Sequence, residues 1–345
     1  MKFILAETEQ KRHYPEYFLV NGANQANPEQ PERVNRLKAG ALAADFTETR
    51  PQEYGLAPIA AVHTAEYMQF LKTAHQRWRR IEGAAPAVTP NIHPTRRDFG
   101  YPASVVAQAG YHMLDASCPI SADTFDSALW SAWTAVSAAE EILSGAPFAY
   151  ALCRPPGHHA REDAAGGFCY FNNSAIAATH LKKRFPRIAI LDVDVHHGNG
   201  TQDIFYHRSD VLTISLHADP KRFYPFFWGH ADERGEGEGL GANLNLPLPR
   251  GTGDADYLKA LDMALHRIAA FTPDALVVAL GLDAFEGDPF AGLAVTTNGF
   301  NAVGEAIAKA TAGTPALLVQ EGGYLCDALG DNLTAFLTGF AKGAN

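Results

Sequence analysis

Residues 188–200 read IAILDVDVHHGNG, an apolar run followed directly by alternating carboxylates and imidazoles. The run Ile188–Val193 is short and almost continuously hydrophobic, which is typical of a parallel strand covered on both faces. Comparable runs occur at Phe3–Ala6, Phe148–Cys153, Val211–Leu216, Ala275–Leu280 and Ala316–Val319. We therefore predict that these runs are strands of one sheet.

Segments with helical periodicity alternate with these runs, at Asn173–Phe185, Asp254–Ala270 and Asn298–Lys309. This rhythm predicts an α/β fold, a single open domain over residues 1–345 with a mostly parallel sheet and helices on both faces. Two long irregular stretches interrupt it. One is an insertion from about Ile81 to Tyr101, and the other, Lys221–Gly241, is first aromatic and then acidic. Loops of this length in a compact domain usually carry function or move.

The composition narrows the class of protein. The 345 residues are 47% hydrophobic and carry a net charge of -10, which argues against non-specific nucleic-acid binding. The four cysteines lack CxxC spacing, so the sequence predicts neither a disulfide framework nor a cysteine zinc site. The first residues are too short an apolar run for a signal peptide, and no segment is apolar enough to span a membrane. We expect a soluble cytoplasmic protein without a nucleic-acid or membrane partner.

Polar clusters follow four of the predicted strands. They are Arg154–His159, Asp192–Gly200, Gly281–Asp283 and Glu321–Tyr324. Open parallel sheets bind their ligands at the carboxyl ends of the strands. The four clusters are therefore expected to converge on one site.

Asp194 and His196 are two residues apart on an extended segment, so they project to the same side together with Asp192. Asp283, at a neighbouring strand end, is the natural third ligand of a metal ion. Two carboxylates and one imidazole leave a position for water, as in catalytic zinc sites. The alternative is that Asp192 and Asp194 only cap the next helix and that His196 bonds locally.

Acid–base groups are also present. His158 and His159 follow two prolines, and histidine can both accept and return a proton near neutral pH. Asp192 and Asn199 are candidate partners, and a carboxylate would raise the pKa of a histidine more than an amide would. Tyr324, after two glycines, could donate its hydroxyl to an oxyanion.

Aromatic residues could form the walls of a narrow tunnel to such a site. Gly167 with Phe168 and, from the aromatic stretch, Tyr224 are the candidates. Phe168 could equally be a core residue.

The motifs RPPGHHA, GGFCYFNN, LDVDVHHGNGTQDIF, SLHAD, LGLDAFEGDP and QEGGY appear in this order over residues 148–325. With them, the chain resembles the histone-deacetylase and acetylpolyamine-amidohydrolase superfamily. The resemblance implies an arginase-like fold, Zn²⁺ (or Fe²⁺) on Asp194, His196 and Asp283, and deacetylation of an amide. Asn199 and Glu321 resemble class II and bacterial members.

The resemblance also assigns roles. His159 would be the general base and acid, His158 with Asp192 an electrostatic element, and Tyr324 the group that polarises the acetyl carbonyl. A structural K⁺ ion would lie near a set of mainly backbone oxygens, those of Asp192, Asp194, His196, Ser215 and Leu216.

Bacterial acetylpolyamine amidohydrolases are the most similar members, in length, insertion and aromatic loop. They imply acetylputrescine and acetylcadaverine as substrates and a homodimer in which the insertion narrows the tunnel. This chain departs from them in carrying Arg96 and Arg97 in the insertion. Phe290 stands where the eukaryotic polyamine deacetylase has a glutamate, with Glu286 and Asp288 as nearby acidic candidates.

Other functions fit parts of the pattern. Acetyl-lysine peptides or other small acylamides could be the substrates. A dinuclear manganese ureohydrolase would need further bridging carboxylates, whereas His197 and Gly198 follow His196. A non-catalytic metal-binding scaffold would require a missing catalytic group, and every one expected is present.

Overall fold

The computed structural model describes residues 1–96 and 100–344. The strands are β1 (Lys2–Ile4), β2 (Tyr17–Val20), β3 (Ala23–Ala26), β4 (Thr47–Thr49), β5 (Phe148–Ala151), β6 (Ile188–Asp192), β7 (Val211–Ala218), β8 (Asn243–Leu248), β9 (Ala275–Leu280) and β10 (Ala316–Gln320). The helices are α1 (Glu7–Gln10), α2 (Glu32–Ala43), α3 (Ala57–Ala60), α4 (Ala65–Trp78), α5 (Val105–His112), α6 (Thr124–Leu143), α7 (Asn173–Leu181), α8 (Asn199–Phe205), α9 (Asp254–Phe271), α10 (Thr297–Ala310) and α11 (Leu329–Ala344), with a 3₁₀ turn at Gly237–Gly239.

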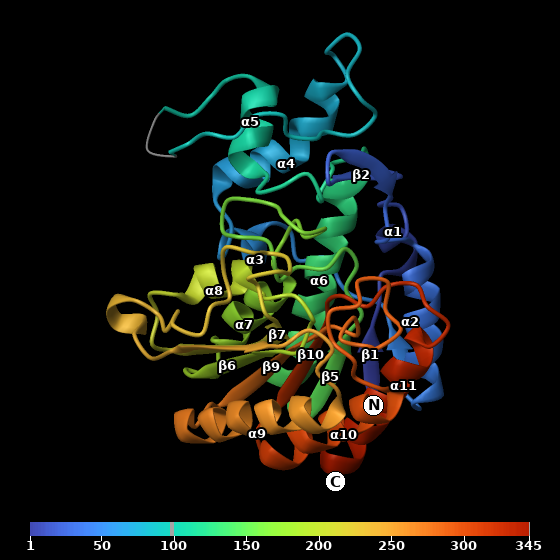
Figure 1. The fold of residues 1–345 in the computed structure, drawn as a ribbon, viewed down its shortest axis with the longest axis vertical. Coiled ribbons are helices and arrows are strands. Elements are labelled where there is room, and N and C mark those ends of the chain that lie inside the picture. The colour runs from blue at the N-terminus through green and yellow to red at the C-terminus, as the bar shows by residue number, and fades with distance from the viewer. Residues whose placement is uncertain (97–99, 345) are drawn as a thin grey trace.

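Eight strands form one sheet in the order β4-β1-β5-β10-β9-β6-β7-β8, and every pairing in it is parallel. The predicted single α/β domain with a mostly parallel sheet is confirmed. Helices α9, α10 and α11 cover one face, while α6 and α7 cover the other (Figure 1).

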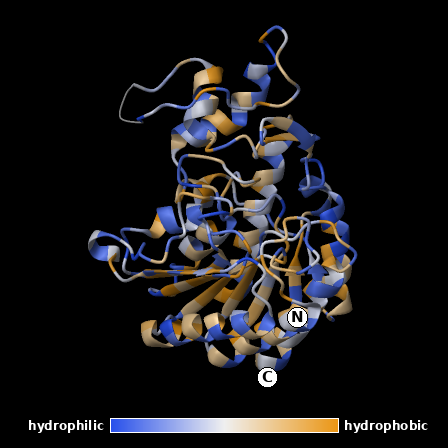
Figure 2. Ribbon diagram, in the orientation of Figure 1, coloured by the Kyte–Doolittle hydropathy of each residue, from blue (hydrophilic) through white to orange (hydrophobic). Residues whose placement is uncertain are grey.

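Two hydrophobic layers flank the sheet because side chains alternate along each strand. In β9, Leu276 and Val278 enter the layer that includes α9 to α11, whereas Val277 enters the layer under α6 and α7. The central strands are correspondingly hydrophobic along their whole length (Figure 2). A third cluster joins α4, α5 and α6, at the end of the molecule from which α4 and α5 project.

The predicted strands and helices all occur, with boundaries shifted by a few residues. The largest difference is the predicted helix Asn173–Phe185, which ends at Leu181. Phe185 precedes Pro186, and a residue before proline is disfavoured in the helical conformation. The helices of the described residues are all too short or too polar to cross a lipid bilayer.

A β-hairpin, β2–β3, was not predicted. Its antiparallel strands are joined by Asn21 and Gly22, both at positive φ (51° and 78°). Asn-Gly between two strands is the sequence signal for this two-residue turn, but the flanking residues do not alternate clearly between apolar and polar.

Candidate metal centre and active site

Four neighbouring strands carry the polar clusters. These strands are adjacent in the sheet, in the order β5-β10-β9-β6, and the segments that follow them lie side by side at their carboxyl ends (Figure 1). β6 ends at Asp192, so Asp194 and His196 lie in the bend that follows the strand rather than on it. They nevertheless meet Asp283, as the spacing predicted.

The candidate metal ligands form one compact group. One ligand atom each from Asp194, His196 and Asp283 lies within 4.8 Å of the others. His196 Nδ1 is 3.1 Å from Asp194 Oδ1 and 3.2 Å from Asp283 Oδ2. The remaining carboxylate oxygens are fixed by backbone groups, since Gly322 N donates to Asp194 Oδ2 (2.7 Å) and Val195 N donates to Asp283 Oδ1 (3.0 Å).

These ligands fit a divalent cation. Both carboxylates are fully buried, and Asp283 Oδ2 accepts no hydrogen bond from any residue that the structure describes. Burial, and then the charge of Asp194, raise the pKa of Asp283. A Cβ atom at Gly322 would lie 2.1 Å from Asp283 Oδ2, so only glycine allows the backbone this close. A cation bound by all three side chains would relieve this buried negative charge.

The two histidines after β5 have different partners. His158 Nδ1 lies 2.8 Å from Asp192 Oδ2, whereas His159 Nδ1 lies 2.6 Å from Asn199 Oδ1. Burial opposes the charge on His158, but the carboxylates of Asp192 and Asp194 outweigh it and raise the pKa of His158. Burial, and next the charge of His158, hold the pKa of His159 well below its usual value. The pKa values of the two neighbouring imidazoles are therefore shifted in opposite directions.

Glu321 fixes the backbone of the histidine pair. Its Oε2 accepts from Gly157 N (2.6 Å) and His158 N (3.0 Å), and its Oε1 accepts from the Ser174 hydroxyl (2.8 Å). Burial raises the pKa of Glu321 to about 7. Its side chain thus connects the segment after β10 to the segment after β5.

A cavity of about 600 Å³ leads to this site, and His159, His196 and Tyr324 are among its lining residues. Tyr224 contacts His159 edge-on, with ring centroids 4.9 Å apart, and the Phe168 ring lies 5.8 Å from that of Tyr324. Both predicted walls therefore border the cavity. Phe168 also packs on Phe18 and is buried, so the two readings of this residue are compatible.

Phe168 reaches the cavity through an unusual backbone turn. Gly167 and Phe168 have φ values of 48° and 66°, a region that costs a non-glycine residue of order 1 kcal/mol. At Gly167 a Cβ atom would lie 2.4 Å from Cδ2 of His159. Glycine at 167 therefore lets the wall touch the imidazole.

Two cavity residues, Asp115 and Phe18, belong to none of the motifs that predict the site. Asp115 Oδ2 accepts from the Tyr224 hydroxyl (2.6 Å) and from Gly167 N (3.2 Å), so it ties both walls together. Among the described residues that line the cavity, Asp115 is the only carboxylate. Phe18 comes from the β2–β3 hairpin, which the Asn21-Gly22 turn could have revealed.

Two other sets of predicted residues can be located. Ser215 on β7 pairs in register with Asp192 on β6, so two of the five residues predicted to bind potassium are neighbours, and the Ser215 hydroxyl lies 2.8 Å from His217 Nδ1. Arg96 is exposed, and Arg97 lies outside the described residues. None of the described insertion residues lines the cavity.

Asp288, an acidic residue considered as a contact for the substrate, is buried, and its carboxylate accepts from backbone N–H groups instead.

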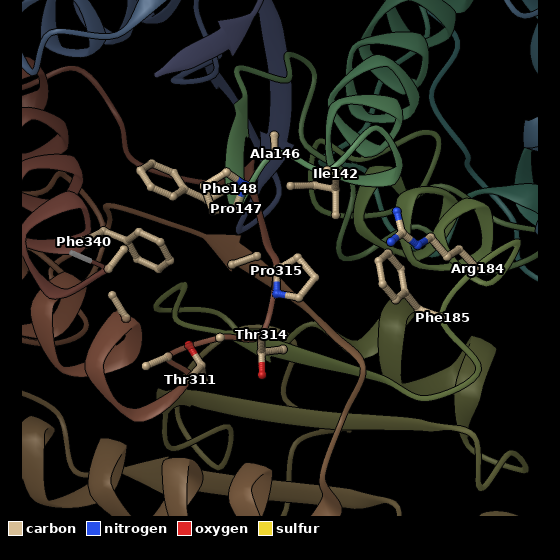
Figure 3. Close-up of a pocket in the computed structure, with 16 residues that line it drawn as sticks. Ile142, Ala146, Pro147, Phe148, Arg184, Phe185, Thr311, Thr314, Pro315 and Phe340 are labelled. Atoms are coloured by element: carbon tan, nitrogen blue, oxygen red, sulfur yellow. The ribbon is translucent and has the colours of Figure 1, made fainter.

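Another cavity, of about 330 Å³, lies at the amino-terminal ends of the strands, where β5 and β10 begin. Figure 3 shows its aliphatic and aromatic lining around Pro315 and Phe340. Arg184 is the only ionisable side chain among its described lining residues, and it donates to Leu143 O (2.9 Å). This cavity lacks the groups for hydrolysis.

Comparison with known proteins agrees with this geometry. Residues 27–340 match the family model described as the histone deacetylase domain. The acetylpolyamine amidohydrolase of Burkholderia pseudomallei (strain 1710b) is 47% identical over 333 residues, 96% of each chain. Acetylpolyamine amidohydrolase 1 of Pseudomonas aeruginosa is 42% identical, covering 97% of this chain and 98% of that one. A crystal structure of the acetylpolyamine aminohydrolase from Burkholderia pseudomallei superposes with a TM-score of 0.95 at 45% identity, covering 99% of both chains.

Proposed function

This chain belongs to the histone deacetylase family and is a hydrolytic deacetylase, and from that premise we propose that it removes the acetyl group from acetylated polyamines and similar small amines. The observation that carries the proposal is the group of Asp194, His196 and Asp283 beside His159 and Tyr324, at a cavity lined mainly by aromatic residues.

We propose that Asp194, His196 and Asp283 hold a divalent metal ion, with Zn²⁺ as the first candidate and Fe²⁺ as the second. When bound, such an ion acts as a Lewis acid toward a carbonyl oxygen and lowers the pKa of water. The two buried carboxylates and the imidazole support this assignment, because hard oxygen and imidazole donors suit these ions.

His159 is proposed as the general base and acid. Asn199 Oδ1 accepts from Nδ1, which fixes the proton there and leaves Nε2 to take a proton from water. The lowered pKa of His159 keeps the ring neutral before reaction. Returning that proton to the departing amine nitrogen completes amide hydrolysis. His158, held charged by Asp192, would act electrostatically.

Tyr324 is proposed as the donor to the carbonyl oxygen of the acetyl group. Burial, and next the carboxylate of Asp283, raise the pKa of Tyr324 well above its usual value, so its hydroxyl keeps its proton. A donor held in place in a buried site stabilises the developing negative charge. Gly322 lets the backbone before Tyr324 approach the metal ligands, and Gly323 takes a φ of 107° that favours glycine.

The cavity favours a slender, positively charged amine. Its walls are aromatic rings that would pack on a methylene chain, and Asp115 provides one carboxylate beside Tyr224. The Asp115 carboxylate would be a counter-charge for an ammonium bound beside Tyr224, whereas Arg222, which lines the same cavity, carries the opposite charge. The names of the similar amidohydrolases point to the same class of substrate.

Steady-state hydrolysis tests this proposal. Zinc-loaded protein would be given acetylputrescine, acetylcadaverine and an acetyl-lysine peptide at matched concentrations. A higher kcat/KM for the two diamines is expected. Preference for the peptide would assign the chain to protein-type substrates, and inactivity on all three would contradict the proposed substrate class.

Three further assignments stay predictions from the resemblance: the structural potassium ion near Asp192 and Ser215, the homodimer formed through the 81–101 insertion, and a cytoplasmic location. Gel filtration and metal analysis of purified protein would test the first two.

A further inference from the structure

Side-chain hydrogen bonds to backbone carbonyls fix the segment after β10. Arg33 donates from Nη2 to Glu321 O (2.7 Å) and from Nε to Gly323 O (2.5 Å). Gln320 Nε2 donates to Gly322 O (2.8 Å). These hydrogen bonds fix the two glycines and Glu321, and the Arg33 guanidinium also lies over the Tyr324 ring, 5.1 Å from its centroid. None of them binds the backbone of Tyr324.

Asp288 makes the contact at Tyr324. Its Oδ2 accepts from Tyr324 N (2.9 Å), and its Oδ1 accepts from Phe290 N (2.9 Å). The side chain is 4% exposed, although aspartate is among the residue types least often buried. One buried carboxylate thus binds the backbone N–H of Tyr324, after β10, and that of Phe290, in the loop after β9.

The two residues that Asp288 holds face each other. The rings of Phe290 and Tyr324 are 4.7 Å apart, edge to face, and both line the cavity. Phe290 also lies edge-on to His196, with ring centroids 5.3 Å apart. A shift of the Asp288 carboxylate would therefore move the phenol and the ring that confines it together.

We propose that Asp288 is a positioning residue for catalysis, which sets the hydroxyl of Tyr324 by holding the backbone of Tyr324 and Phe290 at once. The inference rests on the proposed role of Tyr324 as carbonyl donor. Asp288 touches no reacting atom, so its effect on turnover passes through Tyr324. Displacement of a catalytic group by about 1 Å can cost roughly 10²-fold in rate.

Asp288→Asn is the test variant, because the amide keeps the shape but offers one acceptor oxygen and turns an N–H₂ group toward the other backbone N–H. Asp327→Asn is the matched control, since Asp327 is an exposed carboxylate three residues after Tyr324. The assay is a double-mutant cycle of Asp288→Asn with Tyr324→Phe, with kcat and KM for acetylputrescine measured in zinc-loaded protein. Zinc content and the unfolding midpoint are measured for every variant.

We expect Asp288→Asn to lower kcat by about 10²-fold with KM within a few-fold, and to cost much less in the Tyr324→Phe background. Asp327→Asn should match the wild type. An equal loss in both backgrounds would overturn the positioning role while leaving the role of Tyr324 intact. Near-normal turnover of Tyr324→Phe would instead overturn the proposed role of Tyr324, and this inference with it. If Asp288→Asn fails to fold, the same cycle is run with Asp288→Ser, which retains one acceptor in a smaller side chain.

Discussion

Asn199 Oδ1 lies 2.6 Å from Nδ1 of His159, so the imidazole proposed as the base is oriented by a neutral amide. The neighbouring His158 has the carboxylate of Asp192 at the equivalent place. Because an amide raises the pKa of a histidine less than a carboxylate does, His159 is the ring expected to gain and lose a proton during the reaction.

Asn199→Asp should move the pH dependence of the reaction. A carboxylate beside His159 raises its pKa, and the base must be neutral to act, so the acidic limb of the kcat/KM profile should move to higher pH. Activity at pH 6 should fall relative to that at pH 8. Asn24→Asp, an exposed site on β3, controls for the added negative charge. An unmoved acidic limb would mean that His159 does not control it.

Tyr324→Phe should lower kcat on acetylputrescine by about 10²–10³-fold with little change in KM, because the lost donor acts mainly in the transition state. The variant keeps the ring packing on Phe290 and Phe168. Tyr206→Phe, at the end of α8, is a matched control that should retain full activity. Turnover of Tyr324→Phe close to that of the wild type would remove Tyr324 from the mechanism.

Metal binding should stabilise the fold. Adding Zn²⁺ to chelator-treated protein should raise the unfolding temperature with rising zinc concentration, because an ion that binds only the folded state shifts the equilibrium. The increase should be much smaller in Asp283→Asn and unchanged in Asp232→Asn, an exposed site. Calorimetry would measure the unfolding temperature at each zinc concentration. Equal increases in the wild type, Asp283→Asn and Asp232→Asn would exclude Asp283 as a ligand.

Asp115→Asn should distinguish charge recognition from wall packing. Asparagine can still accept the hydrogen bond from the Tyr224 hydroxyl but carries no charge. KM for acetylputrescine should rise several-fold, as expected for a half-buried ionic contact of about 1 kcal/mol. KM for N-butylacetamide, which lacks the ammonium, should change little. Equal changes for both substrates would show that Asp115 acts only by packing.

His63 should make the fold sensitive to acid. Burial lowers the pKa of His63 to about 4, and its Nε2 accepts from Asn172 N (2.9 Å), which requires a neutral ring. Between pH 6.5 and 4 the unfolded chain binds a proton that the folded chain does not. This contribution to stability is therefore complete above pH 6.5 and lost as the pH falls, at up to about 1.4 kcal/mol per pH unit.

Urea unfolding from pH 7 to 4.5 measures this slope. His63→Gln should be less stable overall but should lose stability less steeply on acidification, whereas exposed His266→Gln should follow the wild type. Identical slopes in His63→Gln and the wild type would contradict the assignment. Other titrating groups are common to these proteins, so the difference isolates His63.

The central strands and the polar residues after them could be predicted because both signals are local. Ala275–Leu280 was predicted with the bounds that the structure has, since six apolar residues between turn residues leave little choice. Asp283 follows three residues later, and any parallel sheet brings it to the same edge as Asp194.

The contacts that join distant segments could not be predicted in this way. Asp115 and Tyr224 are 109 residues apart, and Asp288 binds Tyr324 from 36 residues away. Neither lies in a pattern that periodicity can reveal, because each depends on how two loops are laid against each other. The strand order has the same origin, since β10 pairs not only with β9, the strand before it in sequence, but also with β5, which comes much earlier in the chain.

The strand order has a consequence for how the chain folds during synthesis. β5 and β9 are both synthesised before β10, yet β10 lies between them in the sheet. The segment after β10 carries Tyr324 and Gly322, whose backbone N–H donates to Asp194. A nascent chain halted before residue 316 therefore lacks the middle of its sheet and has no complete catalytic centre. A product truncated there would expose two unpaired strand edges, those of β5 and β9, to chaperones or to aggregation.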